Sequence, residues 1–305
     1  MGNVLIAMDK SNSFRIYLTD TTSLVEKAKS VHETTPLSAA VLGRVLTATG
    51  LMGIMLKNEK DKVTVQFKGD GPAKEVLATA NGEGHVKGYV SNSKLDLPLK
   101  SNGKLDVGAS LGIGELTVIK DIGLKEPYLG RIALVSGEIA EDLTAYFYIS
   151  EQQNSSVNLG VMVGKDYSVT AAGGMIIQML PDFKEEAVTT LENMLDEIEP
   201  ITKIIAEEHL KSDDGNCLKA VLERIFNDVS DEFKPRILEE KSIKWKCDCS
   251  KDRYYSGLMA LNESDLTEMI EEDEYAEVVC QFCRKKYYFS KKELEEIRKE
   301  VKHDN

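Results

Sequence analysis

Four cysteines near the C-terminal end place the tightest constraint on how this 305-residue chain can fold. They form two close pairs, Cys247-Asp248-Cys249 and Cys280-Gln281-Phe282-Cys283, with 30 residues between them. Structural zinc is held tetrahedrally by four Cys or His side chains, and two such pairs supply a complete set. Because the histidines (His32, His85, His209 and His303) lie away from the pairs, the pattern predicts one zinc ion held by Cys247, Cys249, Cys280 and Cys283.

The spacing within each pair bears on oxidation. In an extended chain, residues i and i+2 lie about 6.6 Å apart. That is near the ~6.8 Å outer limit for a disulfide, so a bond between Cys247 and Cys249 needs a local kink. Cys280 and Cys283 have the spacing of a β-turn, whose ends approach within about 7 Å. Zinc keeps thiols ionised, and thiolates react with oxidants. The residues alone leave two interpretations open, a redox switch and a purely structural zinc site.

Composition indicates a soluble cytoplasmic protein. Hydrophobic residues make up 42% of the chain and charged residues 29%, as in globular proteins. The N-terminus has no basic segment and too short an apolar stretch for a secretory signal. Clustered cysteines in that compartment indicate metal binding or redox chemistry before structural disulfides. The longest apolar run, residues 39–56, contains Arg44 and three glycines, so we predict a buried helix there rather than a membrane span.

Residues 1–182 alternate β-branched or aromatic runs with turn residues, a pattern typical of strands. We expect strands at Phe14–Leu18, Val63–Phe67, Arg131–Val135, Leu143–Ile149 and Ser156–Val163. Between the first two we expect helices at Leu24–Val31 and from Thr35-Pro36-Leu37-Ser38, where Pro and Ser suit a first turn. The prediction is an α+β domain with a mostly antiparallel sheet and packed helices.

Residues 183–244 are predicted as a linker of amphipathic helices. Val188, Leu191, Leu195 and Ile198 recur every three or four residues among acidic side chains, a second apolar stripe follows Pro200, and Ser212–Asn216 separates it from a helix at Leu218–Phe226. Residues 183–240 carry 7 basic and 16 acidic groups. Such charge makes the segment marginally stable unless its apolar stripes pack on the first domain. Residues 245–305, with Trp245, form the predicted zinc-binding domain.

Other motifs argue against an enzyme and against nucleic-acid binding. Gly112-Ile113-Gly114-Glu115 lacks the third glycine of a dinucleotide fingerprint, and the sequence has no G-x-x-x-x-G-K-[ST], H-E-x-x-H or G-x-S-x-G motif. A net charge of −13 opposes binding to phosphate backbones. Arg284–Phe289 mixes basic and aromatic residues, but Glu271–Glu274 nearly cancels that charge, and we expect Tyr288 and Phe289 to pack around the zinc. The second hypothesis is a zinc-ribbon module that binds nucleic acid or a protein assembly.

Several motifs resemble one known family. Cys247-Asp248-Cys249 followed by Ser250-Lys251-Asp252-Arg253, and Glu277–Cys283 leading into Tyr287-Tyr288-Phe289, resemble the redox switch domain of the heat-shock protein 33 family of chaperones. The pairing of C-x-C with C-x-x-C is the specific part. The resemblance extends into the first domain through Gly103–Gly112, Gly137–Asp142 and Gly173-Gly174-Met175.

The resemblance implies an ATP-independent holdase that is inactive while its reduced cysteines hold zinc. It implies that oxidation joins Cys247 to Cys249 and Cys280 to Cys283, releases zinc, and unfolds the zinc domain and the linker. The exposed surface then binds unfolded or misfolded client proteins, and the oxidised form tends to dimerise. We expect no membrane or nucleic-acid partner. The isolated Cys217 is predicted to be an ordinary thiol, with an intermolecular disulfide after oxidation as the alternative.

Overall fold

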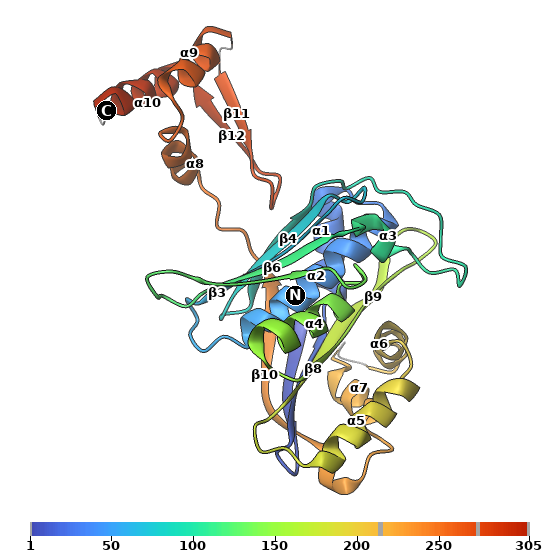
Figure 1. The fold of residues 1–305 in the computed structure, drawn as a ribbon. Helices are drawn as coiled ribbons and strands as arrows, with labels where there is room; N and C mark the ends of the chain where they lie inside the picture. The colour runs from blue at the N-terminus through green and yellow to red at the C-terminus, as the bar shows by residue number, and fades with distance from the viewer. Residues whose placement is uncertain (1, 213–215, 273–274, 304–305) are drawn as a thin grey trace. The chain divides into compact units, whose positions relative to one another are not determined.

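The computed structural model describes residues 2–212, 216–272 and 275–303, which fall into two compact units (Figure 1). The first unit spans Met1–Lys246 and the second Cys247–Asn305. The predicted α+β class is confirmed. Segment 183–244 lies inside the first unit, so it is not a separate body in this state, and its independent behaviour stays a prediction. The predicted runs Ser212–Asn216 and Glu271–Glu274 lie partly outside the described residues.

A ten-stranded sheet forms the centre of the first unit, in the order β7-β6-β3-β4-β5-β10-β1-β2-β9-β8. Its pairings are antiparallel, as predicted, except that β5 and β10 run parallel and pair over two residues only. This short pairing divides the sheet into two halves. The strands are β1 (Gly2–Asp9), β2 (Phe14–Asp20), β3 (Lys62–Gly69), β4 (Glu75–Asn81), β5 (His85–Val90), β6 (Gly114–Asp121), β7 (Tyr128–Ala133), β8 (Ser155–Val163), β9 (Val169–Met179) and β10 (Pro235–Trp245).

Helix α2 (Pro36–Ile54) fills the space between the two halves of the sheet. It contacts β4 and β5 of one half and β8 and β9 of the other, and α1 (Thr22–His32) packs beside it. The Thr35 side chain caps its start by accepting the Ser38 N–H. By length and composition α2 could cross a membrane, but 94% of its most apolar window is buried inside the fold. The predicted buried helix is therefore confirmed.

Helices α5 (Glu185–Glu197), α6 (Ile201–His209) and α7 (Leu218–Ile225) cover the opposite face of β1, β2 and β9 (Figure 1). We call residues 183–234, which hold these helices and the 3-10 turn Asp231–Phe233, the cover. Their apolar stripes share one buried cluster with the strands, in which the rings of Phe14 and Phe226 stack 6.1 Å apart. These stripes pack on the first domain, which is the condition stated above for a stable segment, and the packing buries three strands on both faces.

The last part of the predicted helical linker is a strand. Residues 235–245 form β10, which pairs with β1 along the whole length of β1 and lies between β1 and β5. The sequence PRILEEKSIKW has no stripe of helical period, and β1 would otherwise expose a row of unpaired backbone groups. Pairing with a strand more than 200 residues away therefore overrides the expected helix.

The predicted strand Leu143–Ile149 is also wrong, because these residues lie in helix α4 (Ala140–Glu151). Leu143, Tyr146 and Phe147 recur at helical spacing and are buried. The buried Asp142 carboxylate fixes the start of the helix. It accepts the backbone N–H groups of four residues at 2.7–3.3 Å, namely Val135, Ser136, Gly137 and Ile139. A short helix, α3 (Val107–Leu111), packs nearby against α2.

In the described residues of the second unit, three helices and one hairpin surround a small core. Its elements are α8 (Lys251–Leu258), α9 (Glu263–Glu272), β11 (Tyr275–Val279), β12 (Lys286–Ser290) and α10 (Lys291–His303). Leu266, Phe289, Leu294 and Ile297 are fully buried at its centre. The charged helix expected at Lys291–Lys302 is confirmed.

Replacing Asp142 with Ala should destabilise the first unit by at least about 2 kcal/mol, because it leaves four backbone donors without their acceptor. Urea unfolding followed by Trp245 fluorescence reports on this unit, since Trp245 packs against its core. Glu141→Ala is the matched control, because Glu141 is exposed on the same helical turn. Equal urea midpoints for the two variants would show that the carboxylate does not fix the helix.

Candidate metal centre

The second cysteine pair lies in the turn between β11 and β12. The Cys280 N–H donates to the Lys285 carbonyl at 2.9 Å, and the Arg284 N–H donates to the Cys280 carbonyl at 2.8 Å. Arg284 adopts a left-handed backbone conformation with φ of 61°. These hydrogen bonds close a tight loop around Cys283. The hairpin therefore presents both sulfurs from one rigid turn.

The first pair lies in the short segment between β10 and α8. Ser250 ends this segment by capping α8, since its hydroxyl accepts the Arg253 N–H at 3.2 Å. Cys247 and Cys249 are half-buried, whereas the Cys280 side chain is fully buried. The first pair thus lies at the start of the unit, before α8, and the second pair lies in the hairpin turn in the middle of its sequence.

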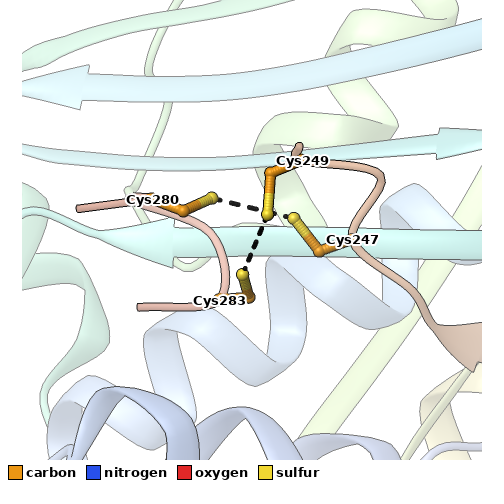
Figure 2. A group of neighbouring side chains, drawn as sticks. All are labelled: Cys247, Cys249, Cys280 and Cys283. Atoms are coloured by element: carbon orange, nitrogen blue, oxygen red, sulfur yellow. Dashed lines mark hydrogen bonds between the residues drawn. The ribbon is translucent and has the colours of Figure 1, made fainter. Parts of the chain in front are cut away.

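The four sulfur atoms converge, as Figure 2 shows. The sulfurs of Cys247 and Cys280 lie 3.7 Å apart, those of Cys249 and Cys283 lie 3.3 Å apart, and all four lie within 4.8 Å of one another. Sulfurs bound tetrahedrally to zinc at ~2.3 Å are separated by about 3.8 Å. A disulfide is shorter, about 2.05 Å, and all five cysteines of the chain are free thiols. The donor set and its spacing therefore fit one tetrahedral metal ion.

Two tyrosines support the thiols. The Tyr287 hydroxyl contacts the Cys249 carbonyl oxygen at 2.9 Å and the Cys249 sulfur at 3.1 Å. The Tyr254 ring lies 5.1 Å from the Tyr287 ring. Burial alone would raise the pKa of Cys280, but hydrogen bonds from Tyr254 and from the N–H groups of Cys283 and Phe282 lower it to about 6. These donors favour the ionised thiolate, which is the form that binds a metal.

The sequence did not identify the correct aromatic side chains. We expected Tyr288 and Phe289 to pack around the site, and Phe289 is indeed fully buried in the unit's core. Tyr288 is 49% exposed and faces away, whereas Tyr287 lies on the same face as Phe289. The strand period could have identified Tyr287, because residues two apart in a strand share a face. If Phe289 is buried, Tyr287 is buried on the same face and Tyr288 lies on the opposite one.

The chain is similar to known proteins of one family over nearly its whole length. The family model described as Hsp33 protein matches residues 3–290. A 33 kDa chaperonin of Alkaliphilus oremlandii is 46% identical over 296 residues, 97% of this chain and 95% of the relative. A 33 kDa chaperonin of Clostridioides difficile is 44% identical over 299 residues, 98% and 99% of the two chains. The crystal structure of a 33 kDa chaperonin (heat shock protein 33 homolog) from Thermotoga maritima matches with TM-score 0.87 and 35% identity, over 99% of both chains.

Replacing Tyr287 with Phe should weaken metal binding at the four thiols roughly tenfold, because groups that hydrogen-bond to ligands typically contribute 10–100-fold to affinity. The ring and its packing remain. Competition for Zn²⁺ with a chromophoric chelator measures the change. Tyr288→Phe is the matched control, since this neighbouring hydroxyl lies on the exposed face. If both variants bind zinc as tightly as the unaltered chain, the Tyr287 hydroxyl does not support the site.

Proposed function

The chain belongs to the Hsp33 family of chaperones, and we propose that it is a redox-regulated holdase, which binds unfolding proteins without using ATP. The observation that carries the proposal is the convergence of four thiols within 4.8 Å, in a unit that follows β10 directly in the sequence. Membership of this family supports chaperone activity. The four thiols are the groups that an oxidant can modify.

In the reduced state we propose that Cys247, Cys249, Cys280 and Cys283 hold one zinc ion. The ion supplies positive charge that keeps the four sulfurs ionised and joins the segment before α8 to the hairpin turn. The unit has a core of only a few large side chains, and units of this size commonly depend on a metal for stability. Loss of the ion is therefore expected to unfold the unit.

Oxidation by hydrogen peroxide converts two thiols to one disulfide. The two ionised sulfurs lose two electrons as they join, and peroxide accepts these electrons together with two protons from solvent to give two water molecules. The family resemblance supports the pairs Cys247–Cys249 and Cys280–Cys283. The shortest contacts run between the pairs instead, so the distances alone do not select this pairing. A sulfur in a disulfide is no longer an anionic ligand, and the zinc is released.

Release of the cover would expose apolar surface on two sides. The strands β1, β2 and β9 would expose the cluster that includes Leu5, Phe14 and Met175, and the helices would expose their own stripes. Exposed apolar patches of this kind bind other apolar surfaces, including those of unfolding proteins. The contacts of Arg224 with Glu199, Glu207 and Glu208 join parts of the cover to one another. The cover can therefore separate from the strands without breaking these ion pairs.

The proposed partners are unfolded or misfolded client proteins. In the oxidised state we also propose that two copies of the chain form a homodimer. We propose a cytoplasmic location, a non-enzymatic function, and no nucleic-acid or membrane partner. The match of the family model to residues 3–290 supports one integrated chaperone over a zinc-ribbon module with an accessory domain.

Peroxide with mild warming should release one zinc ion per chain, convert four thiols to two disulfides, and give the protein the ability to suppress aggregation of a thermally unfolding client. Zinc, free thiols and client light scattering are measured on the same sample, and peptide mapping identifies the pairs. Reduction with added zinc is the control and should reverse all three changes. Retention of zinc together with no suppression of aggregation would exclude the redox chaperone. Salt-dependent binding to RNA or DNA would support the zinc-ribbon alternative instead.

Replacing Phe226 with Ala should release the cover in the reduced protein, because truncating a buried Phe costs about 3–5 kcal/mol. We expect faster proteolysis within residues 183–234 and suppression of client aggregation without peroxide. Leu210→Ala is the matched control, since Leu210 lies in the cover but is 90% exposed. Increased proteolysis without chaperone activity would show that the cover does not conceal the client-binding surface.

A further inference from the structure

A second group of potential metal ligands lies in the first unit, where the cover meets the strands. Asp20 ends β2, His209 ends α6, and Cys217 immediately precedes α7. A ligand atom of each lies within 4.8 Å of the ligand atoms of the other two. No sequence pattern indicates this group, because its members come from three separate elements, and Cys217 was expected to be an ordinary thiol.

The three side chains are held in place by the fold. Asp20 is 9% exposed, and its Oδ1 accepts the backbone N–H of Thr22 at 2.9 Å and the Thr22 hydroxyl at 2.7 Å. The other carboxylate oxygen, Oδ2, forms a hydrogen bond with His209 Nε2. Thr22 thus fixes the carboxylate and leaves Oδ2 directed at the group. The His209 side chain is 34% exposed, which gives an ion access from solvent.

The chemistry around Cys217 does not suit a nucleophile. The side chain is 2% exposed, and burial, reinforced by the negative charges of Asp20 and Glu208, raises the pKa of its thiol to about 12. The thiol is therefore protonated at neutral pH and unreactive. Glu208 is itself bound by Lys211 and Arg224, so Asp20 is the carboxylate that remains directed at the thiol and the imidazole. A buried carboxylate, a half-buried imidazole and a buried thiol together form a set of ligands that suits a cation.

We propose that Asp20, His209 and Cys217 form a second site for a divalent cation of the zinc type. Zinc accepts oxygen, nitrogen and sulfur ligands together, and sites with three protein ligands leave a fourth position for water. Binding displaces the thiol proton of Cys217 to solvent. His209 binds through Nε2 with its ring proton on Nδ1, so this ligand releases no proton.

An ion at this site would stabilise the docked cover, because the ligands come from both the cover and the strands. Asp20 belongs to β2, whereas the other two ligands belong to the cover, so the complete set exists only while the cover is in place. An ion that binds only this state stabilises it by a factor of 1 + [M]/Kd. Free zinc at ten times its Kd would therefore favour the closed cover about elevenfold. If the proposed function is correct, zinc released from the four thiols would oppose release of the cover.

The test starts from the reduced full-length protein carrying one zinc ion at the four thiols. Zn²⁺ is added in competition with a chromophoric chelator, and we expect a second equivalent to bind. His209→Gln and Cys217→Ser should each weaken this second equivalent at least about tenfold, since removing a ligand costs no less than removing a group that supports one. His209→Gln is the safer variant for folding, because this side chain reaches solvent.

His85→Gln is the matched control. His85 Nδ1 lies 2.6 Å from a Glu83 carboxylate oxygen, but this pair belongs to no three-ligand group within the described residues. The control should keep the second equivalent. A second equivalent retained equally by His209→Gln and Cys217→Ser would belong to surface carboxylates and overturn the proposal. Binding of a single equivalent by the unaltered chain would overturn it as well.

Co²⁺ in place of the added zinc gives a second measurement. A thiolate ligand produces a charge-transfer band in the near ultraviolet, which should appear with the second equivalent and be absent in Cys217→Ser. Added Zn²⁺ should also slow proteolysis of the cover in the unaltered chain but not in His209→Gln. None of these measurements uses peroxide or a client. Failure of the second site is therefore distinguishable from failure of the proposed chaperone function.

Discussion

Burial of β1, β2 and β9 on both faces is the constraint on which the first unit depends. Neighbouring residues of a strand point to opposite faces, so Val4 and Ile6 join the core around α2 while Leu5 and Ala7 join the cluster beneath the cover. The two clusters therefore share strands but not side chains. Most of the contact between the cover and the strands is apolar, which has little directional preference, and a few polar contacts such as Asp20 with His209 add to it. If the cover is released as proposed, the core around α2 would persist and the cluster beneath the cover would be exposed.

The parts of the structure that local pattern determines were predictable. Cysteine spacing, the Thr35 cap and the apolar stripes of the cover each depend on neighbours within a few residues. Two features depend on partners distant in sequence, whereas the strand predicted at Leu143–Ile149 failed for a local reason. Leu143–Ile149 has strand-like composition, but Asp142 gathers the amides that begin a helix. The identity of β10 depends on β1, at the other end of the chain. Asp20, His209 and Cys217 meet only because the cover docks.

The two proposed metal sites differ in what they join. The four thiols lie within one small unit, and their chemistry responds to oxidants. Asp20 lies at the end of β2, His209 at the end of α6 and Cys217 immediately before α7, so their geometry depends on the position of the cover. Oxidation would therefore have opposite effects on the zinc occupancy of the two sites. It would remove zinc from the first, and the amount released would set the occupancy of the second.

The position of β10 also governs the order in which the chain can fold during synthesis. β1 is synthesised before β10, its partner on one side, which follows more than 200 residues later. At roughly 5–20 residues per second, a ribosome needs on the order of ten seconds or more to reach it. Throughout that time one edge of β1 lacks its partner, and an unpaired strand edge is a template for aggregation. A nascent chain of this protein would therefore itself be a substrate for other chaperones.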